Sequence, residues 1–251
     1  MYLLVIFIIT LIIPLIVMPR GMRNGLMSPM RNVFSAALSV SVAAAVVLMV
    51  YFLAGNGMFA HIQEIIKVVA KEVAVNPVWD SFPGLDKMNT GDRTALLSQV
   101  YEGLALRMPA YVMTAAAVVA YIEYIIISNM PWNRGKVAKM PGFREFSLPP
   151  AAFSGIFLMY FAAWGISLTD SLFGTAVYAN VNYLFNFAFI LQGISVIFMF
   201  AHIKRIPKAV AVIVVILAFS NNICMMLLVL IGMFDLIIGL KKRISARAVK
   251  K

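Results

Sequence analysis

The chain is poor in charge, in histidine and in cysteine, and each shortage excludes a class of protein. Only 12% of its 251 residues are charged and 63% are hydrophobic, whereas a soluble domain is about 25% charged and close to half apolar. The single cysteine, Cys224, excludes a disulfide within one chain and a cysteine-based metal site. The two histidines, His61 and His202, lie far apart in the expected topology. We therefore expect no metal ion and no cofactor.

Signatures of catalysis are also absent from the sequence. It contains no G-x-S-x-G, no H-E-x-x-H, no Walker A motif and no pair of intramembrane aspartates. These motifs supply the nucleophile, the metal ligands or the phosphate cradle that common hydrolases and pumps require. We therefore expect that the protein is not an enzyme and not a primary pump.

Long apolar runs dominate what is present, and the mean hydropathy is +0.93. About 20 apolar residues in a helix cross the hydrocarbon core of a bilayer. The sequence therefore predicts an all-α polytopic transmembrane helix bundle, a single integral membrane domain over 1–251 with about six or seven membrane segments. The predicted segments are 1–18, 33–53, 108–130, 151–168, 178–201 and 209–240.

The last apolar run, 209–240, is too long for one untilted crossing. As a single helix its 32 residues would extend roughly 48 Å. Ser220, Asn221 and Asn222 interrupt it, so we interpret it either as a hairpin with one short arm or as a broken helix.

The net charge of +11 comes from basic residues placed almost entirely in short loops. Basic runs lie at 20–31, 134–144, 204–208 and in the tail 241–251. Because Lys and Arg mark cytoplasmic loops, we expect all four runs inside the cell and the connection 55–107 outside. This placement favours contact with the lipid bilayer and not with nucleic acid, in a multi-pass membrane protein.

The connection 55–107 is the one long polar segment. Apolar residues recur at helical spacing from Phe59 to Val73, opposite charged residues, and predict an amphipathic helix on the membrane surface. Asn76 and Pro77 end this helix. Thr90 is a candidate N-cap for a second amphipathic helix that leads into the span at 108–130.

Polar side chains inside the spans are the candidate functional residues. Asn182 and Asn186 share one stripe of the helix 178–201, with Gln192 about 80° to one side. An unpaired amide in hydrocarbon costs several kcal/mol, so this stripe must face other helices or a polar cavity. It is either a binding site for a small polar molecule or a set of interhelical hydrogen bonds.

Two carboxylates extend this list. Glu123 lies well inside its span, where a charge costs about 2.5–3.5 kcal/mol. It is either a ligand or proton site, or a residue protonated or paired with Arg134 or Lys136. Asp235 is closer to a helix end, where we favour an interfacial ion pair with Lys241.

Several short motifs in the C-terminal half occur in a recognisable order. They are 142–150 (GFREFSLPP), Asn182, Leu191-Gln192-Gly193, Pro207, Gly232-Met233-Phe234-Asp235 and the basic tail. In this order they resemble the YybS-like family of uncharacterised bacterial multi-pass membrane proteins, over roughly residues 105–245. The family is distantly similar to the S components of energy-coupling-factor transporters. The resemblance therefore implies a membrane subunit that binds a small solute.

The sequence thus leads to two functional hypotheses. In the first, the protein binds or transports a small solute of unknown identity, as a membrane subunit with Asn182, Asn186, Gln192 and Glu123 as ligand-binding residues. In the second, it is a membrane scaffold or regulatory protein without a translocated substrate. In either case we expect a cytoplasmic or membrane partner protein, because nothing in the chain can energise uphill transport alone.

Overall fold

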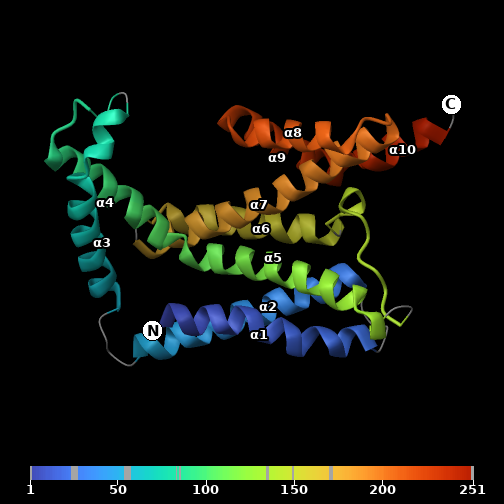
Figure 1. Cartoon of the computed structure of the whole chain (residues 1–251), viewed down its shortest axis with the longest axis horizontal. Coiled ribbons are helices and arrows are strands. Elements are labelled where there is room, and N and C mark those ends of the chain that lie inside the picture. The colour runs from blue at the N-terminus through green and yellow to red at the C-terminus, as the bar shows by residue number, and fades with distance from the viewer. Residues whose placement is uncertain are drawn as a thin grey trace. The chain divides into compact units, whose positions relative to one another are not determined.

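The computed structural model describes residues 2–23, 28–53, 58–82, 84, 86–133, 136–148, 150–169 and 172–249. Within these ranges the chain is helical and has no strand (Figure 1). The α-helices are α1 (Tyr2–Arg23), α2 (Pro29–Leu53), α3 (Met58–Ala74), α4 (Thr90–Leu106), α5 (Met108–Asn129), α6 (Pro150–Ser167), α7 (Leu172–Ile203), α8 (Lys208–Phe219), α9 (Asn222–Ile238) and α10 (Leu240–Val249). Short 3-10 helices are η1 (Pro77–Ser81), η2 (Pro131–Asn133) and η3 (Phe143–Glu145).

Three of the described helices are long and apolar enough to cross a membrane. They contribute Pro29–Val47, Met108–Asn129 and Gly174–Ile203. Shorter apolar helices occupy Ile8–Pro19 and Phe153–Ser167, while α8 and α9 qualify only together, as a bent pair. The predicted all-α polytopic membrane bundle is confirmed. Its long spans are fewer than six or seven, because the described apolar parts of α1 and α6 fall short of about 20 residues.

Two helix boundaries differ from those expected. The first helix does not end at residue 18 but continues to Arg23, through Pro14 and Pro19. Proline is tolerated within membrane helices, where neighbouring groups satisfy the freed carbonyls. The polar helix begins at Leu172, ahead of the apolar run that predicted it. Both helices therefore extend beyond the apolar runs from which the sequence predicted their ends.

The chain divides into two compact units, and the boundary falls within α5. The first comprises Met1–Gly21 and Arg31–Glu123, and the second Met22–Met30 and Tyr124–Lys251. In the first unit α1, α2 and α5 pack through small residues, with Ala37, Val40 and Ala116 at the buried centre. Small residues of this kind let membrane helices approach each other closely.

The connection 55–107 forms the helices α3 and α4, which pack against each other. Ala70, Ala74 and Leu97 form their buried contact, and Trp79 Nε1 donates a 2.7 Å hydrogen bond to the Val73 carbonyl. The N-cap of α4 is Asn89 and not Thr90, because the Asn89 side chain accepts the Asp92 amide hydrogen at 2.8 Å. Part of the apolar face of α3 is thus covered by α4.

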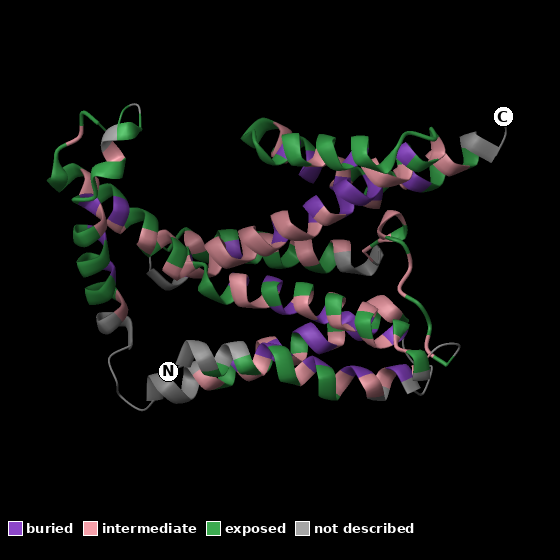
Figure 2. Ribbon diagram, in the orientation of Figure 1, coloured by how far each residue is buried: buried purple, intermediate pink, exposed green. Residues whose placement is uncertain are grey.

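Helix α7 is the centre of the C-terminal unit. It packs against α6 on one side and against α9 on another, with further contacts to η3, α8 and α10. Figure 2 shows buried residues gathered along α7 and α9. The core combines aromatic rings from α6 and α7 with aliphatic residues of α7 and α9: Phe153, Phe157, Phe185, Phe189, Ile194, Leu228 and Val229.

Helices α7 and α9 approach closely at a pair of glycines, Gly193 and Gly232. A Cβ added to Gly193 would lie 2.1 Å from the Leu228 carbonyl oxygen, and one added to Gly232 would lie 2.1 Å from the Phe189 carbonyl oxygen. The two backbones therefore touch directly. In a membrane no hydrophobic force drives helices together, because lipid tails are as apolar as the side chains. Close van der Waals packing of this kind stabilises the helix pair instead.

The chain reverses between α8 and α9, with a bend of 118°. Asn221 forms the N-cap of α9, and its side chain accepts the Ile223 amide hydrogen at 2.8 Å. At about 1.5 Å per residue, the 12 residues of α8 extend only about 18 Å, less than the hydrocarbon core. Residues 209–240 thus bend sharply at the predicted interruption, as either a hairpin with one short arm or a broken helix would.

Arg205 ends α7 in a conformation that favours glycine. Its φ is +55°, and the Ile206 amide donates to the Ala201 carbonyl at 2.8 Å while the Arg205 amide donates to the His202 carbonyl. These bonds form a Schellman motif, whose left-handed position is usually glycine. The left-handed conformation costs an ordinary residue about 1–2 kcal/mol.

Candidate functional site

Four buried polar side chains of the C-terminal unit meet at one end of it. Gln192 and Ser195 lie one turn apart on α7, and neither has exposed surface. Asp235 of α9 and Lys241 of α10 are also buried. We call these four side chains, with the backbone of residues 144–148, the Gln192–Asp235 network.

Gln192 connects two segments that are distant in sequence. Its Nε2 donates to Asp235 Oδ2 at 2.5 Å, and its Oε1 accepts the Leu148 amide hydrogen at 3.0 Å. Because a buried amide needs partners for both its oxygen and its nitrogen, this single residue fixes α9 and the segment before α6 against α7.

Asp235 also determines how α9 passes into α10. Gly239 ends α9 with a φ of +65°, and the chain turns back so that the Lys241 amide donates to Asp235 Oδ1 at 2.7 Å. The carboxylate thus caps the N-terminus of α10, where the helix dipole favours a negative charge. Gly239 is required here because the left-handed turn brings residues 235 and 241 together.

The Lys241 ammonium group has three acceptors for its three hydrogens. Its Nζ lies 3.3 Å from Asp235 Oδ2 and 3.0 Å from Ser195 Oγ, and it also donates to the Phe146 carbonyl. The predicted Asp235–Lys241 ion pair is confirmed, although it is buried and not exposed at the interface. Burial lowers the pKa of Lys241, while the nearby Asp235 carboxylate acts in the opposite direction.

Ser195 completes the network on the side of the loop. Its hydroxyl lies 2.8 Å from the Phe146 carbonyl oxygen and 3.2 Å from that of Arg144, so it bonds η3 and the residue that follows it. Every polar atom of this network has a partner. The arrangement therefore holds a loop, a tail helix and two membrane helices together, and it leaves no free group for catalysis within the network.

The structure separates the residues that the sequence grouped as one stripe. Asn186 Nδ2 donates to the Asn182 carbonyl at 2.8 Å and lies 3.2 Å from Asn182 Oδ1, so these two amides pair along α7. Both side chains are half-buried. Gln192 instead belongs to the Gln192–Asp235 network, on the part of α7 that faces α9.

Glu123 lies in the other unit, on α5. Its Oε2 is buried and has no hydrogen-bond partner among the described residues. An unpaired buried carboxylate oxygen indicates either a neutral acid or a missing partner. Of the two cations proposed to pair with it, Lys136 is exposed, and Arg134 lies outside the described residues. The proton or ligand interpretation of Glu123 stays a prediction.

Sequence reasoning missed Ser195 as a member of the network, and the close contact of Gly193 with Gly232. A signal for both was present. Gly193 follows Gln192 directly, Ser195 is three residues beyond Gln192, and Gly232 precedes Asp235 by one helical turn. Small residues beside buried polar ones mark the faces on which two membrane helices meet.

Comparisons with known proteins agree with the membrane architecture. A family model described as "Predicted membrane protein (DUF2232)" matches residues 1–236. The uncharacterised protein YybS of Bacillus subtilis (strain 168) is 23% identical over 141 residues, which cover 55% of this chain and 44% of that protein. No solved structure matches the chain. The similarity to S components of energy-coupling-factor transporters stays a prediction.

Proposed function

The chain belongs to the DUF2232 family of predicted membrane proteins, and we propose that it acts as a non-catalytic scaffold or regulatory subunit. Its working surface is the end of the C-terminal unit where the tail and the loop before α6 meet. The observation that carries this proposal is the Gln192–Asp235 network, which orders the tail helix α10 and residues 144–148 against α7 and α9. The protein itself translocates no substrate.

A buried ion pair of this kind fixes the position of a segment more than it contributes to the free energy of folding. Apolar residues of similar volume would stabilise a helix contact equally well or better, because two charges lose their hydration on burial. What the Asp235–Lys241 pair provides is a fixed place for α10. The exposed cations Lys242 and Arg243 follow on that helix, and Arg144 lies on the adjacent loop, half-exposed. Although Glu145 pairs with Arg144, these cations leave a net positive charge that suits an acidic segment of a partner protein.

We expect photo-crosslinkers at positions 144 and 242 to capture one specific partner protein in native membranes. With the crosslinker at position 144, reversal of the exposed charges in Lys242→Glu with Arg243→Glu should abolish the adduct because the partner segment is acidic. Mass spectrometry of the adduct identifies it. A crosslinker at Leu158, which is 73% exposed on α6, is the matched control and should capture mainly lipid.

Transport by the protein alone would contradict the scaffold proposal. If the purified protein accumulates a solute in liposomes under a proton gradient, without a second protein, the proposal is wrong. Uphill transport requires ATP hydrolysis or a coupled ion, and the sequence offers only Glu123 as an acid well inside a span.

A second function rests on the Asn182–Asn186 pair. Two half-buried amides lie along α7, and the Tyr160 and Tyr178 hydroxyls, 3.1 Å apart, continue the same polar row by one turn. A row of amides and hydroxyls in an apolar setting suits a small polar solute, with few polar groups that fix its orientation. In this alternative the protein is the solute-binding membrane subunit of a larger transporter.

Asn182→Leu and Asn186→Leu distinguish this alternative from simple helix packing. Both substitutions remove a polar group from an apolar span, so expression and insertion should remain close to normal. If the row is a solute site, the variants keep their melting temperature without solute and lose the stabilisation that retained small molecules give. If it provides hydrogen bonds only, the melting temperature falls without any solute, by an amount matching about 0.6–2 kcal/mol per bond.

A further inference from the structure

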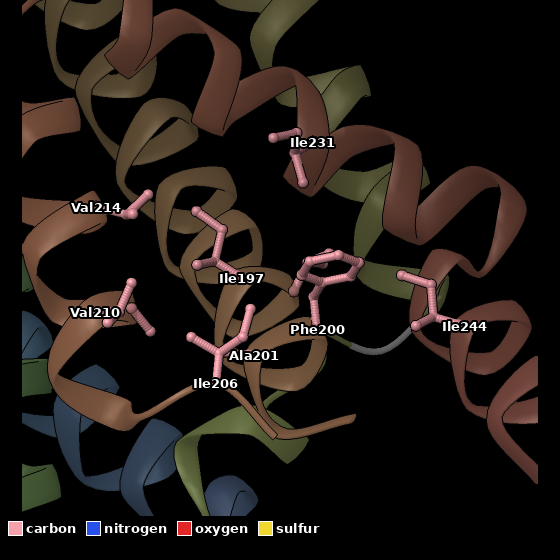
Figure 3. A pocket seen from close by; sticks show the side chains of 10 residues that line it. Ile197, Phe200, Ala201, Ile206, Val210, Val214, Ile231 and Ile244 are labelled. Atoms are coloured by element: carbon pink, nitrogen blue, oxygen red, sulfur yellow. The ribbon is translucent and has the colours of Figure 1, made fainter. Parts of the chain in front are cut away.

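An apolar groove opens beside the end of α7, between side chains of α7, α8, α9 and α10 (Figure 3). Its volume is about 360 Å³, and its lining carries hydrocarbon only, from residues such as Ile197, Phe200, Val210, Val214, Ile231 and Ile244. Phe200, Val210 and Val214 are each close to half-exposed. The groove is thus open to its surroundings and accepts a flexible hydrocarbon chain.

Basic residues border this groove at the turn between α7 and α8. Lys204, Arg205 and Lys208 are all exposed, and Lys204 Nζ lies 6.0 Å from the ring centroid of the groove residue Phe200. Between residues 196 and 249 the only acid is Asp235, which is buried and paired with Lys241. The border of the groove is therefore positive without local compensation.

Arg205 adds an independent observation. It occupies the left-handed position of the Schellman motif, where glycine would be free of strain, and its neighbour Ile206 lines the groove. Strained backbone conformations of this kind cluster at binding and catalytic sites. The strained residue here is an arginine, whose guanidinium group is well suited to bind a phosphate, and it directly precedes a residue that lines the groove.

We propose that the groove and the turn 204–208 bind one anionic phospholipid. An acyl chain occupies the groove, and the lipid phosphate lies against Arg205 and Lys204. The charge pattern selects this occupant, since positive side chains near the membrane surface attract anionic headgroups. A second copy of this chain, with a net charge of +11, would on balance be repelled by this basic border.

The test is native mass spectrometry of the purified protein after exchange into mixed micelles with phosphatidylglycerol or phosphatidylcholine of identical acyl chains. We expect one phosphatidylglycerol to be retained in preference. Arg205→Gly should lower its affinity about fivefold, as should Lys204→Ser, because each basic residue near the surface contributes a similar attraction. Val214→Phe, which fills the groove, should lower retention with all charges in place. Soluble glycerol phosphate should not compete, because it has no acyl chain.

Arg205→Gly also separates binding from folding. The variant should melt at an equal or higher temperature in neutral lipid, since glycine relieves the left-handed strain, yet lose its preference for phosphatidylglycerol. Arg205→Lys should keep the preference, and Leu158→Phe on the exposed face of α6 should change nothing. Equal retention of both lipids, or retention unaffected by Arg205→Gly and Val214→Phe, overturns the proposal. So does a dimer that disappears when the groove is filled, because the occupant is then a second copy.

Discussion

Asp235→Ala is expected to lower the free energy of unfolding by about 3–5 kcal/mol, which is the cost of removing one partner of a buried ion pair. The substitution leaves the Lys241 ammonium group buried among Ser195, the Phe146 carbonyl and apolar side chains, with no counter-charge. It also removes the acceptor for the Gln192 amide and the cap of α10. Unfolding titrations in mixed micelles, followed by tryptophan fluorescence, measure the loss.

Two matched variants identify the cause of this loss. Glu145→Ala removes the carboxylate of the exposed Arg144–Glu145 pair, 3.5 Å apart, and should change stability by less than about 1 kcal/mol. Asp235→Leu combined with Lys241→Met removes both charges together. This double variant should recover the part of the loss that comes from the uncompensated Lys241 charge. It should keep the loss of about 1 kcal/mol for the missing helix cap and of about 1–3 kcal/mol for the unpaired Gln192 amide. Equal losses in Asp235→Ala and the double variant would contradict the role of the buried charge.

The pH dependence of Asp235→Ala gives a further check with a definite sign. Burial already lowers the pKa of Lys241 below its ordinary value of 10.5, and the substitution removes the carboxylate that opposes this shift. The folded variant then binds fewer protons than the unfolded chain between its lowered pKa and 10.5. Its stability must therefore rise as the pH increases through this window, because the neutral amine is no longer penalised by burial.

The fold class followed from the sequence because it depends on a strong local signal. Apolar runs of helical length, separated by short basic loops, have few solutions other than a membrane helix bundle. The position of the break at Ser220–Asn222 could also be predicted, because polar residues interrupt an apolar run there. The first residue of α4 could not be predicted in this way, since Asn89 and Thr90 are both good N-caps and only the backbone geometry selects Asn89.

The candidate site could be predicted only in part, because its partners are distant in sequence. Periodicity placed Gln192 near the stripe of Asn182 and Asn186, but periodicity does not say which helix covers each face. The partner of Gln192 is Asp235, 43 residues later and beyond a hairpin. In contrast, the Asp235–Lys241 pair was predictable, since only six residues separate its members.

Gly193→Ala and Gly232→Ala are expected to have the second large effect, a loss of about 3 kcal/mol or more in each case. An added Cβ at either position would lie 2.1 Å from a backbone carbonyl oxygen of the facing helix. No side-chain rotation relieves a clash with backbone, so α7 and α9 must move apart. Overpacking of this kind costs about 1–3 kcal/mol when the neighbours are flexible, and more when they are not.

Gly155→Ala is the matched control on α6. A Cβ there has no heavy atom within 4 Å, and alanine favours the helix by up to about 1 kcal/mol, so stability should be unchanged or slightly higher. The same unfolding titration measures all three variants. Separation of α7 from α9 would also lengthen the Gln192–Asp235 hydrogen bond, so Gly232→Ala combined with Asp235→Ala should lose less than the sum of the two single losses. Additive losses would show that the glycine contact and the polar network stabilise the helix pair independently.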